Sequence, residues 1–267
     1  MRKVLFPTEF SKHASQMFHY ALELAHKLDA ELLVMHAFGK PDPLVTNVSD
    51  DTREHRVLDK LNAFIENYRP SKFDSHPIRA VAYLDYPADA ILNVAKKENV
   101  QVIVMGMTGK NDEVEKYLGS NALRVLRLAE CPILVIPANL HFKPLERIVF
   151  TTNFEFEDIM VLNHLRKAYD AEIDVLHVFS KDKDRQDSEA RMKALEEISS
   201  GQEKLAFTLV QGADVEDAIE KYVIDRGADL LAMTTHKRNL FTAMIDKSLT
   251  RNIARDTITP LFVFKTT

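Results

Sequence analysis

The chain has 267 residues, 46% hydrophobic and 28% charged, which is ordinary for a soluble globular protein. Its formal net charge of -5 argues against general binding to nucleic acid or to a membrane surface, because such proteins are normally basic. A single cysteine, Cys131, excludes an internal disulfide framework and a cysteine-based zinc site. The first apolar run is too short for a signal peptide, and no run approaches the roughly 18 residues of a membrane span, so we expect a cytoplasmic protein.

Short apolar runs alternate with helical patterns along the first half of the chain. Residues 4–6 read as a strand buried on both faces, and Ser11 is placed to cap the helix that follows. Pro87 suits the first turn of a later helix. The remaining strands are expected at residues 32–35, 78–83, 102–105 and 133–136, and the remaining helices around residues 58–68 and 120–128. This alternation predicts an α/β fold, with a mostly parallel sheet covered by helices on both faces.

The same pattern occurs in both halves of the chain. KVLFPTEF, DAELLVMHAFGK and CPILVI in the first half correspond to RIVFTTNF, DAEIDVLHVFSK and TPLFVF in the second half. The second copy is shorter, mainly because the polar stretch at residues 40–52 has no counterpart. The sequence therefore predicts two tandem domains of one fold, residues 1–140 and 145–267, joined by a short connection.

Three of the 7 glycines of the chain lie between the fourth strand and the fourth helix of the first copy. Gly106, Gly109, Gly119 and Ser120 form the pattern G-x2-G-x9-G-S, which is neither the Walker A pattern nor the dinucleotide fingerprint. In open parallel sheets, ligands bind at the carboxyl ends of the strands, and a helix N-terminus favours a phosphate. The pattern predicts a phosphate-binding loop; the alternative is a tight strand–helix turn with no ligand.

The glycine spacing, the opening VLFPTEFS, the LLVMHA strand and the CPILVIP ending resemble the universal stress protein family, and the tandem arrangement resembles its two-domain members. The resemblance implies a Rossmann-like fold that binds ATP, with or without Mg or Mn. It also implies that the glycine loop and Ser120 hold phosphates and ribose. By the same resemblance, the adenosine side is lined by Pro7, Thr8, Glu9 and Ala37. Glu9 departs from the family's usual aspartate, which moves the carboxylate by one methylene.

The second copy lacks the glycine loop. Thr234, Lys237 and Lys247 stand where the first copy has its three glycines, and Asn153 stands where it has Glu9. We expect a degenerate, structural copy; the alternative is that the two lysines bind another anion.

Members of this family commonly pair through the fifth strand. The resemblance therefore implies that residues 133–136 pair with residues 261–264 in an internal pseudo-dimer, and a homodimer of whole chains is possible. Such pairing would cover two exposed sheet edges.

Other candidate residues have simpler interpretations. His36 and His177 recur at the end of equivalent strands, so we expect a shared structural hydrogen bond rather than two catalytic groups. The acidic residues 112–115 could reach a phosphate-bound metal or form a solvated loop. No nucleophile–base pair supports efficient turnover.

The leading hypothesis is a stress-response protein in which ATP is a ligand or switch, with at most slow hydrolysis. A structural or partner-binding protein without nucleotide is the alternative. An adenylyl-transferring or ATP-pyrophosphatase enzyme would need an H-x-G-H or S-G-G-x-D motif, and neither is present.

Overall fold

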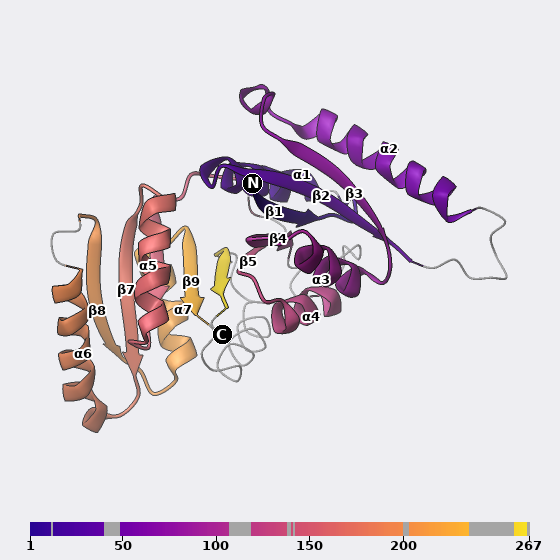
Figure 1. The fold of residues 1–267 in the computed structure, drawn as a ribbon. Coiled ribbons are helices and arrows are strands. Elements are labelled where there is room, and N and C mark those ends of the chain that lie inside the picture. The colour runs from indigo at the N-terminus through magenta and orange to yellow at the C-terminus, as the bar shows by residue number, and fades with distance from the viewer. Residues whose placement is uncertain are drawn as a thin grey trace. The chain divides into compact units, whose positions relative to one another are not determined.

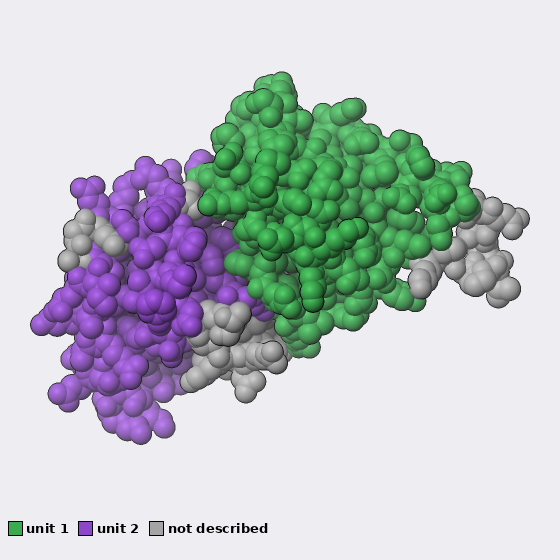
Figure 2. Space-filling model, in the orientation of Figure 1, with its two compact units in different colours: residues 1–142 green, residues 143–267 purple. Residues whose placement is uncertain are grey.

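The computed structural model describes residues 1–11, 13–39, 49–106, 119–137, 140, 142–199, 203–234 and 259–265. The chain divides into two compact units, Met1–Phe142 and Lys143–Thr267, which Figure 2 shows in different colours. Among the described helices, none combines the length and the apolar character that crossing a bilayer requires.

The first unit alternates strands and helices throughout (Figure 1). Its sheet has the strand order β3-β2-β1-β4-β5, and every neighbouring pair is parallel. Its elements are β1 (Arg2–Pro7), α1 (Ala14–Lys27), β2 (Ala30–Phe38), α2 (Asp50–Tyr68), the 3-10 turn η1 (Ser71–Phe73), β3 (Ile78–Leu84), α3 (Pro87–Lys97), β4 (Val102–Gly106), α4 (Ser120–Leu128) and β5 (Ile133–Ile136).

The strand order places helices on both faces of this sheet. Right-handed crossovers put α1 and α2 on one face of the sheet. After β3, successive strands are added on the other side of β1, so α3 and α4 cover the opposite face. An aromatic cluster fills the first interface: the ring of Phe6 on β1 lies 6.0 Å from that of Phe18 on α1, and Phe18 lies 5.4 Å from Phe64 on α2. Leu5, the next residue back along β1, points to the opposite face and is fully buried there. The predicted α/β class with a parallel sheet is confirmed.

The second unit repeats this order. Its sheet runs β10-β9-β6-β7-β8, again with parallel neighbours. Its elements are β6 (Arg147–Thr151), α5 (Phe156–Ala168), β7 (Glu172–Phe179), the 3-10 turn η3 (Asp182–Asp184), α6 (Arg185–Ile198), β8 (Leu205–Gln211), α7 (Val215–Arg226), β9 (Leu230–Thr234) and β10 (Leu261–Phe264).

Two helix starts differ from the prediction. Helix α1 begins at Ala14 with His13 as its N-cap, so Ser11 is not the cap; its carbonyl accepts the backbone N–H of Ala14 at 3.0 Å instead. Helix α2 begins at Asp50 rather than near residue 58, because the side chain of Ser49 caps it by accepting the N–H of Thr52. The first turns of α2 are exposed, so they carry no apolar periodicity that a sequence pattern can register.

Candidate functional site

A cavity of about 330 Å³ lies in the first unit, at the carboxyl ends of β1, β2 and β4. The starts of three helices, α1, α3 and α4, also contribute to its wall. The residues that line it are Phe6, Pro7, Thr8, Glu9, Ser11, Ala14, Met17, Met35, His36, Ala37, Pro87, Ile91, Met105, Gly106, Gly119, Ser120, Asn121 and Ala122. This is the edge of a doubly wound sheet at which ligands bind, near the point where the strand order reverses.

The loop after β1 is held against the neighbouring strand by Thr8. The backbone N–H of Thr8 donates to the carbonyl of Met35 at 2.8 Å, and its hydroxyl accepts the N–H of Phe10 at 3.1 Å. Phe10 has a φ of 60°, in the left-handed region that bulky side chains rarely adopt. The hydroxyl bond stabilises this turn, which fixes Pro7, Thr8 and Glu9 in the cavity wall.

His36 ties the end of β2 to the same loop. Its Nδ1 lies 2.6 Å from the carbonyl oxygen of Thr8, so Nδ1 carries the proton and donates. The second unit repeats the bond, with Nδ1 of His177 2.8 Å from the carbonyl oxygen of Thr152. Burial lowers the pKa of His177, which favours the neutral ring that this bond requires. The predicted structural hydrogen bond is therefore present in both units, and in the first it sets the place of Ala37.

The N-terminus of α4 forms the opposite side of the cavity. Gly119 is the N-cap, and Ser120, Asn121 and Ala122 begin the helix; all of them line the cavity. The first N–H groups of a helix have no acceptor within it, and the helix dipole favours an anion there. Gly119 has φ -60° and ψ 153°, which any residue adopts, so backbone conformation does not explain a glycine at this position. Glycine is accepted as an N-cap, and its missing side chain leaves space beside the helix end.

The cavity brings together the predicted site residues that the structure describes. Pro7, Thr8 and Glu9 follow β1, Ala37 lies near the end of β2, Gly106 ends β4, and Gly119 and Ser120 begin α4. Gly109 lies outside the described residues, as do residues 112–115 and the second-copy lysines Lys237 and Lys247.

Sequence reasoning missed much of the apolar wall. Met17, Met35, Met105, Pro87 and Ile91 line the cavity, yet in the sequence they read as core positions of helices and strands. A buried side chain that faces a cavity has the same periodicity as one that faces the core, so no signal separates them. Ser11 also lines the cavity, although a serine that follows a strand predicts a helix cap.

The described part of the cavity wall carries few charged side chains. Among its described residues, Glu9 is the one carboxylate, and no lysine or arginine is present. No cluster of three or more His, Cys, Asp or Glu side chains that could hold a metal ion occurs in the part of the chain that the structure describes. The other polar groups of the described wall are hydroxyls, the Asn121 amide, backbone N–H groups and the His36 ring, all of which can orient a polar ligand.

Comparison with known proteins agrees with this architecture. The chain is 27% identical over 146 residues to the universal stress protein MJ0531 of Methanocaldococcus jannaschii, covering 51% of this chain and 81% of that protein. It is 23% identical over 295 aligned positions to the universal stress protein Slr1230 of Synechocystis, covering 99% of this chain and 100% of that protein. A crystal structure of a universal stress protein from Archaeoglobus fulgidus superimposes with a TM-score of 0.70 at 18% identity, covering 98% of each chain.

The model of the universal stress protein family matches the chain twice, at residues 1–137 and at residues 160–265. The predicted resemblance is therefore confirmed, and the chain belongs to the universal stress protein family.

Proposed function

We propose that this protein binds ATP in the cavity of the first unit, and that the nucleotide acts as a ligand or switch in a stress response, with at most slow hydrolysis. The observation that carries the proposal is the convergence of three distant segments on one cavity: residues 7–9 after β1, Ala37 near the end of β2, and Gly119 with Ser120 at the start of α4. A cavity of about 330 Å³ is within the range of about 300–1,000 Å³ that ligand sites occupy.

The wall offers a complement to each part of a nucleotide. The N–H groups of Ser120 and Asn121 and the Ser120 hydroxyl would donate to phosphate oxygens. The Glu9 carboxylate would accept from ribose hydroxyls, and the backbone at Ala37 would meet the adenine edge. Thioethers such as those of Met17 and Met35 are polarisable and pack well on an aromatic ring, which suits the purine face.

The described wall has no lysine or arginine to neutralise a triphosphate. A triphosphate would rest on helix-end N–H groups and hydroxyls, with Mg²⁺ or Mn²⁺ entering as the counter-ion of the phosphates. We expect most bound ATP to be released unhydrolysed, as suits a switch.

Mass spectrometry of the small molecules that denaturation releases from the purified protein tests the proposal directly. We expect an adenine nucleotide, and calorimetric titration of the emptied protein should then show ATP binding, with GTP binding more weakly. No released nucleotide and no heat with ATP would contradict the proposal and would favour a structural or partner-binding protein.

A further inference from the structure

Asp158 is a buried carboxylate in the first turn of α5, in the second unit. The residue is only 1% exposed. One oxygen, Oδ2, accepts the Thr152 hydroxyl at 2.8 Å and the backbone N–H groups of Asn153 at 2.9 Å and Glu155 at 3.2 Å. The other, Oδ1, accepts the Thr234 hydroxyl at 2.6 Å. A buried charge is stable only when it is ligated in this way.

The position of Asp158 in the second unit is the position of Ala14 in the first. Both follow by four residues a phenylalanine in left-handed conformation, Phe10 with φ 60° and Phe154 with φ 64°. In each unit, the threonine two residues before this phenylalanine accepts its N–H through the hydroxyl, at 3.1 and 2.9 Å. The two loops are thus built alike, and the buried positions of α1 and α5 keep the same register from Ala14 and Asp158 onwards.

The groups that surround Asp158 have counterparts that line the cavity of the first unit. Thr152, Asn153 and Glu155 correspond to Thr8, Glu9 and Ser11, which all lie in the cavity wall. Thr234 corresponds to Gly106, the last residue of β4, which also lies in the wall, as does Ala14 itself. Where the first unit has an alanine methyl group beside open space, the second unit has a carboxylate on four donors.

We infer that the Asp158 carboxylate fills, in the second unit, the space that corresponds to the cavity of the first, and that the residue at this position decides which unit accepts a nucleotide. The second half of this inference rests on the proposed function; the first half does not. The chemistry is that of competition for donors and space: the carboxylate uses the hydroxyls and N–H groups of the loop, on the side where the adenosine of a nucleotide would come.

A replacement of Asp158 tests the occupied site without any nucleotide. Asp158→Ala removes only the carboxylate group, so formate has the size and charge to refill the space. We expect the melting transition to fall by on the order of 10 °C, because buried donors lose their acceptor. Formate should then raise the melting temperature of the variant more than that of the parent, with sodium chloride at equal ionic strength as the control.

The reverse replacement tests the selectivity. Ala14→Asp places the carboxylate on the loop of the first unit, where we expect ATP affinity to fall more than tenfold while the melting temperature is kept. Ala14→Leu is the matched control: it adds similar bulk with no acceptor oxygens, so it should lose ATP binding and stability together. Because this comparison uses the first unit, it keeps the inference testable if Asp158→Ala does not fold.

The outcomes separate the inference from the function on which it rests. An Asp158→Ala variant with unchanged melting, or one that formate affects no more than it affects the parent, would overturn the carboxylate as occupant. Parent protein that binds ATP, beside an Ala14→Asp variant that binds it equally well, would overturn the selectivity. Parent protein that binds no ATP would remove the proposed function, and formate rescue would still support the occupied site.

Discussion

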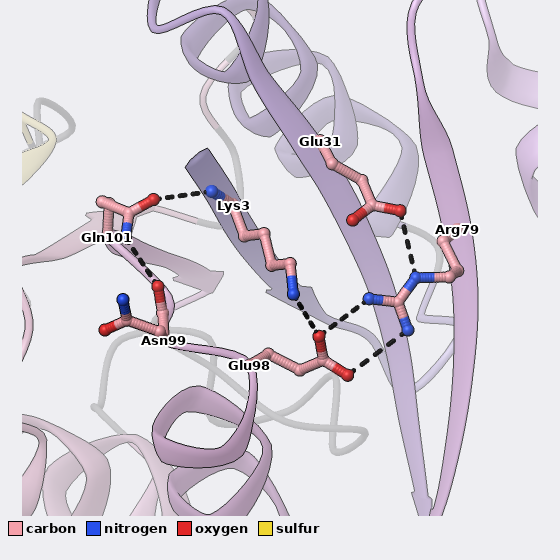
Figure 3. Close-up of polar contacts among 6 residues, drawn as sticks. All are labelled: Lys3, Glu31, Arg79, Glu98, Asn99 and Gln101. Carbon is pink, nitrogen blue, oxygen red and sulfur yellow. Dashed lines mark hydrogen bonds and ion pairs between the residues drawn. The ribbon is translucent and has the colours of Figure 1, made fainter. Parts of the chain in front are cut away.

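Arg79 on β3 donates from its guanidinium to both carboxylate oxygens of Glu98, at 2.9 and 3.4 Å, at the amino ends of the first unit's strands (Figure 3). Lys3 on β1 contacts the same carboxylate at 2.5 Å, and Arg79 also donates to Glu31 on β2 at 3.0 Å. The network joins three neighbouring strands to the end of α3, at the opposite end of the sheet from the cavity. It therefore offers a stability test that leaves the candidate site untouched.

The first prediction concerns the pH dependence of this network. Hydrogen bonds from Arg79, and then from Lys3, lower the pKa of Glu98 to about 2, whereas an unfolded glutamate has a pKa of about 4.3. The folded pKa is the lower one, so the stabilisation is complete above about pH 5 and is lost as the pH falls toward 2. Glu98→Gln should lower the free energy of unfolding by about 1 kcal/mol at neutral pH and by less at pH 3.

Urea denaturation of the parent and the variant across this pH range measures the difference. Glu66→Gln, at an exposed glutamate of α2, is the matched control and should cost little at any pH. A Glu98→Gln penalty that is the same at pH 7 and pH 3 would show that the charge of Glu98 is not the source of the stabilisation.

The second prediction concerns stoichiometry. The second copy has lost the three glycines of the loop, and Asp158 ligates the donors that correspond to cavity groups of the first unit. Calorimetric titration of the full chain with ATP should therefore give one site per chain. Two equivalent sites would contradict both the degenerate second copy and the assignment of Asp158 as its occupant.

The third prediction concerns the pairing of the two units. In the first unit β5 pairs with β4, and its four residues Ile133–Ile136 are all apolar. We predict that β5 pairs with the equivalent strand β10 as an internal pseudo-dimer. A chain of residues 1–140 alone would then present an apolar sheet edge and should self-associate or precipitate. Sedimentation of that fragment as a stable, soluble monomer would count against the pairing.

How far the sequence predicts this structure depends on whether a feature is periodic or local. The strands, the duplication and the bounds of α4 follow from hydrophobic periodicity and repeat, and the structure has them where they were expected. The start of α2 does not, because its exposed first turns have no apolar stripe. Asp158 is a harder case: an aspartate in the first turn of a helix reads as an ordinary favourable charge. Only the fold shows that it is buried and that it accepts the hydroxyl of Thr234, a residue 76 positions away.

The candidate site likewise contains residues that the sequence predicts and residues that it does not. Glycine spacing and family resemblance point to Gly106, Gly119 and Ser120, and the structure brings these three residues to the wall of one cavity. The methionine side of the wall has no such signal in the sequence, since cavity-facing and core-facing side chains obey one period. The sequence also does not reveal that Gly119 has an ordinary backbone conformation. The property of this glycine to test is therefore its missing side chain and not its backbone flexibility.

The last prediction uses that distinction. Gly119→Lys introduces the residue that the second copy carries at Lys247, at a position where the backbone tolerates any side chain. The added ammonium attracts phosphate, but the Cβ and the stem compete for the space through which phosphate reaches the helix-end N–H groups. Sterics should prevail, because a point charge does not reproduce the geometry of a cradle of N–H donors. Losing two or three charge-assisted hydrogen bonds, at about 1.5–3 kcal/mol each, would weaken ATP binding by well over tenfold.

The matched control is Gly39→Lys, the same change at a glycine whose added Cβ would meet no atom within 4 Å. It adds the same charge to the same unit, at an exposed residue that is not among the described residues of the cavity wall, and should therefore weaken ATP binding far less than Gly119→Lys does. Both variants should melt near the parent temperature, so that affinity is compared between folded proteins. If folded Gly119→Lys binds ATP as tightly as Gly39→Lys does, the glycine at the start of α4 serves a structural turn, and the phosphate does not rest there.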